Sequence, residues 1–330
     1  MRGEDLDPEI REFVRRMGEA WAQHQGLASA SPSEARRIAD QVRAPWTRGG
    51  PVMAAVTEHR VPCGDGDVRV RCYVPDEADS MPGLIYLHGG GWTLFSLDTH
   101  DRLMREYASR AGIVVIGVDY ALSPEAKYPV ALDQVCAVAR VLGKRGREFH
   151  VDSRHLAIGG DSAGGNLATA ACLRLRDEGD EGLMQAMVLN YGVFDRWSSP
   201  EARARFGGEG YMLGADEMEA FWRNYLRDDR DAADPLVCPV NADPSRLPPA
   251  LFVVPACDLL TEQSLRMADR MRAAHVPVDV RVYAGASHSF LEAVSIAPLA
   301  DRALAESASW LRAALNAEGD LSSRAAGESR

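Results

Sequence analysis

The chain has 330 residues, of which 46% are hydrophobic and 26% are charged. A chain of this length and composition can bury about 75% of the surface that its unfolded form exposes, which excludes wholesale disorder. Its 48 acidic residues outnumber its 37 basic ones, and the net charge of −11 opposes binding to nucleic acid or to anionic lipid. The densest basic stretch covers only residues 144–147, so we expect no nucleic-acid partner.

Several classes of protein are disfavoured by what the sequence lacks. No apolar run reaches the roughly 18 residues that a membrane-spanning helix needs, and residues 1–10 lack the apolar core of a secretion signal. The six cysteines lie far apart, which favours free, buried thiols in a reducing cytosol, so we expect a cytoplasmic protein. The histidines show no metal-binding spacing, and we expect neither a metal nor a cofactor.

The first 50 residues are predicted to be helical. One apolar stripe recurs at helical spacing through Ile10, Phe13, Val14, Met17 and Trp21. A second helix is expected over residues 33–42, entered through a serine cap and a proline in the first turn.

The central part of the chain alternates between strand and helix patterns. Apolar and polar residues alternate over 68–74, which predicts a half-buried strand. Short apolar runs then follow at 84–87, 113–118, 156–158, 187–189, 251–254 and 278–283, with helix-like segments at 131–145, 162–177, 262–275 and 299–316. This order predicts an α/β fold, in which helices cover both faces of a mostly parallel sheet.

An aromatic-rich stretch at residues 194–235 interrupts that order. Surface packing alone could explain it, but we interpret it as a lid over a pocket. The end of the chain, residues 318–330, is polar and small, and we expect it to be disordered.

A glycine-flanked serine follows the run at 156–158. Residues 160–164 read Gly-Asp-Ser-Ala-Gly and open an amphipathic stretch, which is the strand–turn–helix context of a nucleophilic serine, here Ser162. The glycines leave room for the hydroxyl to project from a strained turn. A phosphate-binding loop is the alternative, but no Lys-Ser or Lys-Thr pair follows.

Three consecutive glycines follow the run at 84–87, in the sequence His-Gly-Gly-Gly-Trp at residues 88–92. Such a backbone offers N–H donors of the kind that stabilise an oxyanion in acyl transfer. A flexible turn is the alternative for this motif alone. We expect His88 to brace the loop and not to act as the catalytic base.

A nucleophilic serine needs a base and an acid that orients it. His288 follows the run at 278–283, and Asp258 follows the run at 251–254, so both are expected at the sheet edge where Ser162 emerges. The chain order Ser162, Asp258, His288 is the one expected for this architecture. Glu262 is the alternative acid.

With these motifs in view, the chain resembles the hormone-sensitive lipase-like family of bacterial carboxylesterases, which are α/β-hydrolases. The matching segments are HGGGW at 88–92, DYALSPE at 119–125, GDSAGGN at 160–166, YGVFD at 191–195, DLL at 258–260 and GASHSF at 285–290. The resemblance implies an α/β-hydrolase fold with a mostly parallel, eight-stranded sheet flanked by helices, plus a helical cap. It also implies that Ser162, Asp258 and His288 form a catalytic triad, and that Gly89, Gly90 and Ala163 supply oxyanion donors.

The resemblance further suggests how the chain is divided. Residues 1–50 and 194–235 are expected to form the cap, and residues 51–193 and 236–317 the catalytic core. We expect the substrate pocket to be lined by Trp92, Tyr191, Phe194 and Tyr211. Trp197, Phe206 and Trp222 are expected to add apolar walls. By likeness to the family, a homodimer formed through the last strand and helix is a candidate assembly.

These expectations point to a serine esterase that acts on small-molecule carboxylic esters of about C2 to C8 acyl length, the size suited to a capped apolar pocket. Acyl transfer to another alcohol or amine, amide cleavage and lactone cleavage share the same acyl-enzyme and stay open. A non-catalytic small-molecule receptor with this fold is a second alternative, which the complete set of three triad residues disfavours. A partner-binding scaffold would require the aromatic insertion to form an exposed patch.

Overall fold

The computed structural model describes residues 3–24, 30–64 and 66–327, and it describes side chains as far as residue 315. Its strands are β1 (Ala55–Cys63), β2 (Gly66–Val74), β3 (Met81–Leu87), β4 (Val114–Asp119), β5 (Val151–Asp161), β6 (Ala186–Asn190), β7 (Ala250–Cys257) and β8 (Val278–Ser287). Its α-helices are α1 (Pro8–Ala22), α2 (Pro32–Thr47), α3 (Asp101–Ala111), α4 (Val130–Arg145), α5 (Ala163–Asp177), α6 (Pro200–Phe206), α7 (Ala215–Tyr225), α8 (Thr261–Ala273) and α9 (Pro298–Gly327). Short 3-10 helices are η2 (Gly146–Phe149), η3 (Asp229–Ala233), η4 (Pro239–Asn241) and η5 (Phe290–Ser295).

All eight strands form one sheet in the order β1-β2-β4-β3-β5-β6-β7-β8. β2 pairs antiparallel with both β1 and β4, and the other neighbours pair in parallel. The six apolar runs predicted as strands are β3 to β8, and the alternating segment at 68–74 lies in β2. The predicted α/β class and the mostly parallel sheet are therefore confirmed.

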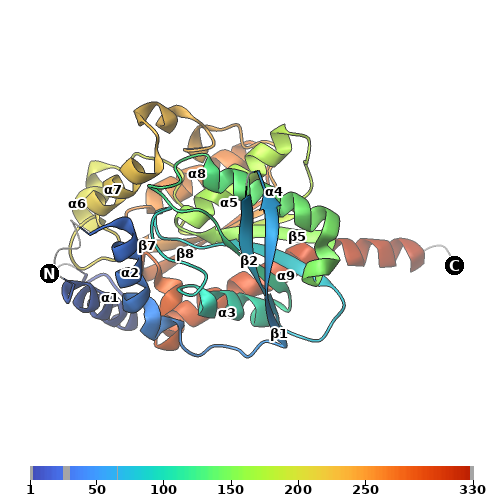
Figure 1. The fold of residues 1–330 in the computed structure, drawn as a ribbon, viewed down its shortest axis with the longest axis horizontal. Helices are drawn as coiled ribbons and strands as arrows, with labels where there is room; N and C mark the ends of the chain where they lie inside the picture. The colour runs from blue at the N-terminus through green and yellow to red at the C-terminus, as the bar shows by residue number, and fades with distance from the viewer. Residues whose placement is uncertain (1–2, 25–29, 65, 328–330) are drawn as a thin grey trace.

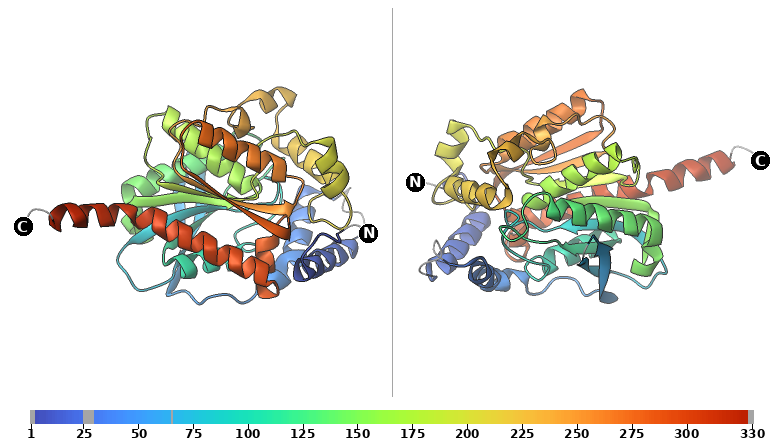
Figure 2. Two further views of the ribbon diagram at one scale, coloured as in Figure 1. Left: turned by 180° about the vertical axis from the view of Figure 1, so that it is seen from behind. Right: turned by 45° about the horizontal axis from the view of Figure 1, so that its top comes forward.

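Helices cover both faces of this sheet, and each face has its own apolar core. α4 and α5 pack against each other on one face together with α8, whereas α3 packs against α9 on the other (Figure 2). Because β3 to β7 are largely buried on both sides, their sequences are nearly continuous apolar runs, whereas β8 at the edge of the sheet alternates apolar with polar residues.

Helices α1, α2, α6 and α7 lie together at one end of the molecule, and we call them the cap helices (Figure 1). Asp7 caps α1 by accepting hydrogen bonds from the N–H groups of Glu9 and Ile10, and Ile10, Phe13 and Met17 of the predicted stripe are buried. Ser31 caps α2 as predicted. The division into cap and core stays a prediction, although the cap helices fall within its two cap segments.

Two boundaries differ from the sequence predictions. α2 does not end at residue 42 but continues through Pro45 to Thr47, and the buried Trp46 packs edge-on against Phe13 of α1, with ring centroids 4.6 Å apart. α9 continues to Gly327, where disorder is predicted from residue 318, and residues 328–330 lie outside the described residues.

Two elements are absent from the predictions. β1 alternates polar with partly buried positions and lies at the edge of the sheet, so it lacks a continuous apolar run. α3 buries Leu103, Met104 and Tyr107 at helical spacing, and it ends at Gly112, whose φ of 65° is the left-handed conformation typical of a helix C-terminus. The periodicity and the glycine are a sequence signal that could have identified α3.

Candidate active site

Ser162 lies in a sharp turn between β5 and α5. Its φ of 55° and ψ of −117° are strained for a residue with a side chain, and they direct the hydroxyl away from the strand. Gly160 and Gly164 allow the turn to approach the neighbouring strand, since an added Cβ would lie 2.2 Å and 1.8 Å, respectively, from the carbonyl oxygen of Leu87. The predicted strand–turn–helix context of Ser162 is therefore present.

His288 and Asp258 meet Ser162 at the carboxyl end of the parallel strands. Asp258 follows β7 and His288 follows β8, so the sheet brings together residues that are far apart in sequence. The Nδ1 of His288 lies 2.7 Å from Oδ2 of Asp258, and its Nε2 lies 3.0 Å from Oγ of Ser162. All three side chains are buried.

The carboxylate of Asp258 is itself fixed by the backbone. Its Oδ1 accepts a hydrogen bond from the N–H of Leu260 at 3.0 Å, which leaves Oδ2 directed at His288. Glu262, the alternative acid, instead accepts a hydrogen bond from the Ser199 hydroxyl at 2.8 Å. Asp258 is therefore the carboxylate that can hold the imidazole in the tautomer that presents Nε2 to the serine.

The glycine loop after β3 forms a wall of the same site. Gly90 and Gly91 line a small cavity together with Ser162 and His288. Gly89 packs against the residue before the serine, since an added Cβ would lie 2.3 Å from Oδ2 of Asp161. Ala163 is the first residue of α5, so its N–H has no acceptor within the helix and is free to bind an anion.

Cap helices contact this glycine loop from outside. Arg36 of α2 donates hydrogen bonds to the carbonyl oxygens of Thr93 and Ser123, both at 2.8 Å. Phe221 of α7 lies against Gly91, where an added Cβ would come within 2.1 Å of the phenyl ring. The loop is thus held between the sheet and the cap helices.

His88 supports the loop from within the core. Its Nδ1 lies 2.7 Å from the carbonyl oxygen of Gly89, and its ring stacks on Tyr120 with centroids 4.5 Å apart. Burial, together with the nearby His100, lowers the pKa of His88 to about 3, so the ring is neutral at physiological pH. These contacts support the bracing role expected for His88.

A buried polar cluster lies next to the serine. Asp161 accepts hydrogen bonds from the Tyr86 hydroxyl at 2.9 Å and from Nε2 of His100 at 3.2 Å. Burial alone would raise the pKa of Asp161, but His100 and Tyr86 outweigh it and lower that pKa. The ligand atoms of His100, Asp161 and Glu292 lie within 4.8 Å of one another.

The spacing of these three side chains would suit a bound cation. An arginine, however, already supplies a positive charge at this place. Arg43 of α2 forms a buried ion pair with Glu292 of η5, and its guanidinium lies 4.2 Å from the ring centroid of Phe95. The carboxylate of Asp161 is already engaged by Tyr86 and His100. Because the donors have partners within the protein, we assign no metal to this cluster.

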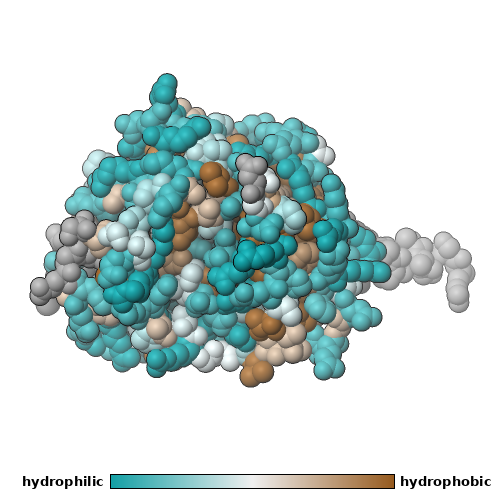
Figure 3. Space-filling view, viewed as in Figure 1, coloured by the Kyte–Doolittle hydropathy of each residue, from teal (hydrophilic) through white to brown (hydrophobic). Residues whose placement is uncertain are grey.

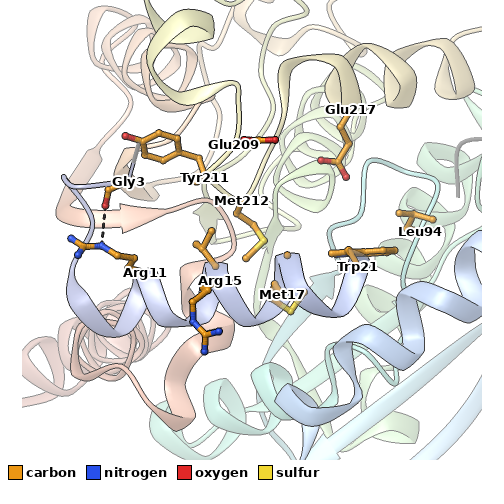
Figure 4. Close-up of a pocket in the computed structure, with 13 residues that line it drawn as sticks. Gly3, Arg11, Arg15, Met17, Trp21, Leu94, Glu209, Tyr211, Met212 and Glu217 are labelled. Carbon is orange, nitrogen blue, oxygen red and sulfur yellow. Dashed lines mark hydrogen bonds between the residues drawn. The ribbon is translucent and has the colours of Figure 1, made fainter. Parts of the chain in front are cut away.

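Two neighbouring cavities lie near the serine and share part of their lining. The larger has a volume of about 540 Å³ and lies between α1 and the segment 209–217 (Figure 4). The smaller, about 50 Å³, contacts Ser162 and His288 directly. Five residues line both cavities and therefore lie between them, and we call this set the neck: Met17, Trp21, Leu94, Met212 and Glu217.

Only one of the four predicted pocket residues lines these cavities. Tyr211 contacts the larger cavity, but Trp92, Tyr191 and Phe194 line neither cavity and are fully buried. Trp92 stacks on Tyr225 at 4.2 Å, Phe194 packs against Phe252 at 5.6 Å, and Tyr191 lies edge-on to His288 at 5.0 Å. Their large apolar rings gain more by joining the core than by facing a cavity.

The additional aromatic walls are also placed differently. Trp222 is buried, whereas Trp197 is 54% exposed. Neither cavity is lined by Trp197, Phe206 or Trp222. The residues that line both cavities include Met17 and Trp21, whose spacing in the sequence predicts a packed helix but not a cavity wall.

Several known proteins with similar sequences or structures are esterases. Residues 84–292 match a family described as having an alpha/beta hydrolase fold. The chain is 36% identical over 270 residues to an acetyl esterase of Salmonella choleraesuis, covering 81% of this chain and 83% of that protein. An acetyl esterase of Salmonella enteritidis matches with the same identity and coverage.

Among solved structures, a hyperthermophilic esterase from the archaeon Pyrobaculum calidifontis has a TM-score of 0.87 at 30% identity, covering 95% of this chain and 99% of that chain. A thermostable esterase from Pseudomonas putida has a TM-score of 0.88 at 26% identity, covering 94% and 98% of the two chains.

Fold and similarity together define a carboxylic ester hydrolase with the α/β-hydrolase fold. The chain belongs to the hormone-sensitive lipase-like family of bacterial carboxylesterases, and it is a serine carboxylesterase. Its substrates are small-molecule esters. Among the described residues, none of the helices combines the length and apolarity needed to cross a bilayer.

Proposed function

We propose that Ser162, His288 and Asp258 are the catalytic residues and that the preferred substrates carry a short acyl group, acetyl above all. The observation that supports the first part is the unbroken chain of hydrogen bonds from Asp258 through His288 to the Ser162 hydroxyl. The acyl preference is supported by the volume of about 50 Å³ beside the serine, and by the acetyl esterases among the relatives.

In the proposed reaction, Nε2 of His288 takes the proton of the Ser162 hydroxyl as its oxygen attacks the ester carbonyl. The carbonyl oxygen becomes an oxyanion and accepts hydrogen bonds from the N–H groups of Gly89, Gly90 and Ala163. When the tetrahedral intermediate collapses, the bond to the alkoxy oxygen breaks and His288 returns the proton to the leaving alcohol. Water then repeats these steps on the acyl-enzyme and releases the carboxylic acid and free Ser162.

The two cavities suggest how an ester is oriented. The small cavity would take the acyl group, and the cavity of about 540 Å³ would take the alcohol portion. A long acyl chain has no room beside the serine without displacing cavity walls such as Phe221 and Leu213. We therefore expect the preferred acyl groups to lie at the short end of the C2 to C8 range.

The test is hydrolysis of p-nitrophenyl acetate, butyrate, octanoate and palmitate by the wild-type protein and by Ser162→Ala. We expect kcat/KM to fall with each increase in acyl length, and we expect the variant to lose more than about 10⁴-fold on the acetate. Circular dichroism checks that the variant is folded. A variant that keeps its activity would overturn the assignment of Ser162, and equal rates on acetate and octanoate would overturn the acyl preference.

We further propose that the protein is cytoplasmic and forms a homodimer through β8 and α9. β8 is the last strand in the sheet order, and Val282 on it is 54% exposed, which leaves an edge where a second copy could pair.

A further inference from the structure

The neck between the two cavities combines apolar side chains with a single carboxylate. Four of its five residues are apolar, namely Met17, Trp21, Leu94 and Met212, and the fifth is Glu217. Any group that joins the ester to the contents of the larger cavity must pass these side chains. A charge at this position therefore acts on the part of the substrate next to the scissile bond.

Glu217 has few partners of its own. It lies in the first turn of α7, and among the described residues its side chain accepts one hydrogen bond, from the N–H of Gly214 at a long 3.4 Å. Within the described part of the chain, it forms no ion pair with any arginine, lysine or histidine. Figure 4 shows its carboxylate pointing from α7 into the cavity, across the neck from Trp21 of α1.

The surroundings of Glu217 already disfavour an isolated negative charge. Glu217 keeps an exposed surface, but the protein packed around its carboxyl raises the pKa of that group, and the N–H of Gly214 and the nearby Arg43 offset the effect only in part. A positively charged ligand beside the carboxylate would replace the lost solvation.

Arginines near the cavities are committed elsewhere. Arg15 forms ion pairs with Glu12 and Glu19. Arg43 is paired with Glu292 and stacks on Phe95. These contacts leave Glu217 without an ion-pair partner among the described residues.

Arg11 also lines the larger cavity, but at a distance from the neck. It donates hydrogen bonds to the backbone carbonyl oxygens of Gly3 and Leu6, at 3.1 Å and 3.0 Å. Figure 4 places it at the opposite end of the cavity from Glu217. Arg15 and Glu209 also line the larger cavity, so it carries both signs of charge, whereas Glu217 is the charged residue at the neck.

We infer that Glu217 and Trp21 form a subsite for a positively charged group, a protonated amine or a quaternary ammonium, on the alcohol portion of the ester. The carboxylate supplies the opposite charge and the indole face supplies a cation–π contact. The net charge of −11 favours the approach of such cations. This inference rests on the proposed function, because it takes the ester bond to be cleaved at Ser162.

The experiment compares two esters of the same shape. Acetylcholine carries a quaternary nitrogen, and neohexyl acetate has a carbon atom in its place. We expect wild-type kcat/KM to be about tenfold higher for acetylcholine, mainly through a lower KM. In Glu217→Gln this ratio should fall to near one, and in Trp21→Leu it should fall by severalfold. Because the ratio is taken within each variant, a change in the fraction of folded protein does not affect it.

Asp216→Asn is the matched control, since Asp216 precedes Glu217 on the same turn, is exposed and lines neither cavity. It should keep the wild-type ratio. If both aliphatic esters react too slowly, the same ratio is obtained from the inhibition constants of choline and neohexyl alcohol against p-nitrophenyl acetate.

A wild-type ratio near one, or a ratio that Glu217→Gln leaves unchanged, would overturn the inference. Failure of the proposed function has a different result, namely ester hydrolysis that is as fast in Ser162→Ala as in the wild type. Hydrolysis that depends on Ser162 but does not distinguish the two esters would reject the subsite and retain the catalytic assignment.

Discussion

At the scale of single residues, the buried imidazole of His88 is a source of acid sensitivity. The unfolded chain carries an ordinary imidazole, with a pKa of 6.5, whereas burial and His100 lower the pKa of His88 in the folded protein to about 3. Between these two values the unfolded state binds a proton that the folded state does not. Stability must therefore fall as the pH is lowered through this window.

We expect His88→Asn to reduce this dependence. The wild-type free energy of unfolding should carry a contribution from His88 of up to about 1.4 kcal/mol per pH unit between pH 4 and 6, which the variant lacks. Urea unfolding of both proteins across this range measures the difference, and carboxylates that titrate in both proteins cancel in it. Parallel curves would show that His88 does not contribute.

Single residues also show what limits a prediction from sequence. Ser162, Asp258 and His288 each follow a strand of a parallel sheet, so their strands alone predict that they meet at one edge, and the structure brings them within hydrogen-bond distance. Trp92 and Phe194 follow strands in the same way, but their side chains turn into the core. A strand end fixes where a residue lies and does not fix which way a large apolar side chain turns.

At the scale of elements, the ion pair between Arg43 and Glu292 joins α2 to η5, the segment that follows His288. Both side chains are about 95% buried, being 4% and 5% exposed, so neither charge has water as a substitute partner. Removing one charge leaves the other buried without compensation.

We expect Arg43→Met to lower the free energy of unfolding by about 3 kcal/mol. The double variant Arg43→Met with Glu292→Leu should recover most of this loss, since a buried pair can be replaced by apolar side chains of similar volume. Urea unfolding of the wild type, both single variants and the double variant gives the coupling. A double variant that is no more stable than Arg43→Met would mean that the charges are not coupled.

Elements differ in how well the sequence predicts them, and the reason is burial. β3 to β7 lie inside the sheet, and their nearly continuous apolar runs predict them from the sequence. β1 has a polar, partly exposed face, so it contains no continuous apolar run that would identify it as a strand. The neck could not be predicted, because it joins α1, the loop at Leu94 and the segment 212–217, whose proximity is a property of the tertiary fold.

At the scale of the whole molecule, the aromatic insertion does not form a large exposed apolar patch. Trp222 and Tyr225 are buried, Phe206 and Tyr211 are partly buried, and Trp197 is exposed. The face seen in Figure 3 is mainly hydrophilic, with apolar residues in small separate groups. This distribution does not support the alternative of a partner-binding scaffold.

The reactivity of the cysteine thiols reports how tightly the whole molecule is packed. Five of the six cysteines are buried, and Cys63 is partly buried. Burial raises the pKa of Cys72 and Cys136 to about 12 and that of Cys238 to about 11, which suppresses the reactive thiolate.

We expect at most one thiol to react rapidly with Ellman's reagent in the native protein, and all six to react after unfolding in guanidinium without a reductant. The released thionitrobenzoate is measured by its absorbance. Fewer than six thiols after unfolding would reveal a disulfide, and several fast native thiols would show that the core opens more readily than the packing implies.

Arg36 and Phe221 contact the glycine loop, so the conformation of that loop depends on the cap helices as well as on the core. Exchanging cap helices between relatives is an attractive route to new substrate ranges. Here such a graft would remove the surfaces that shape the backbone donors, and the recipient would lose rate together with its old specificity. The transferable module for this chain is therefore residues 88–95 together with α2 and α7.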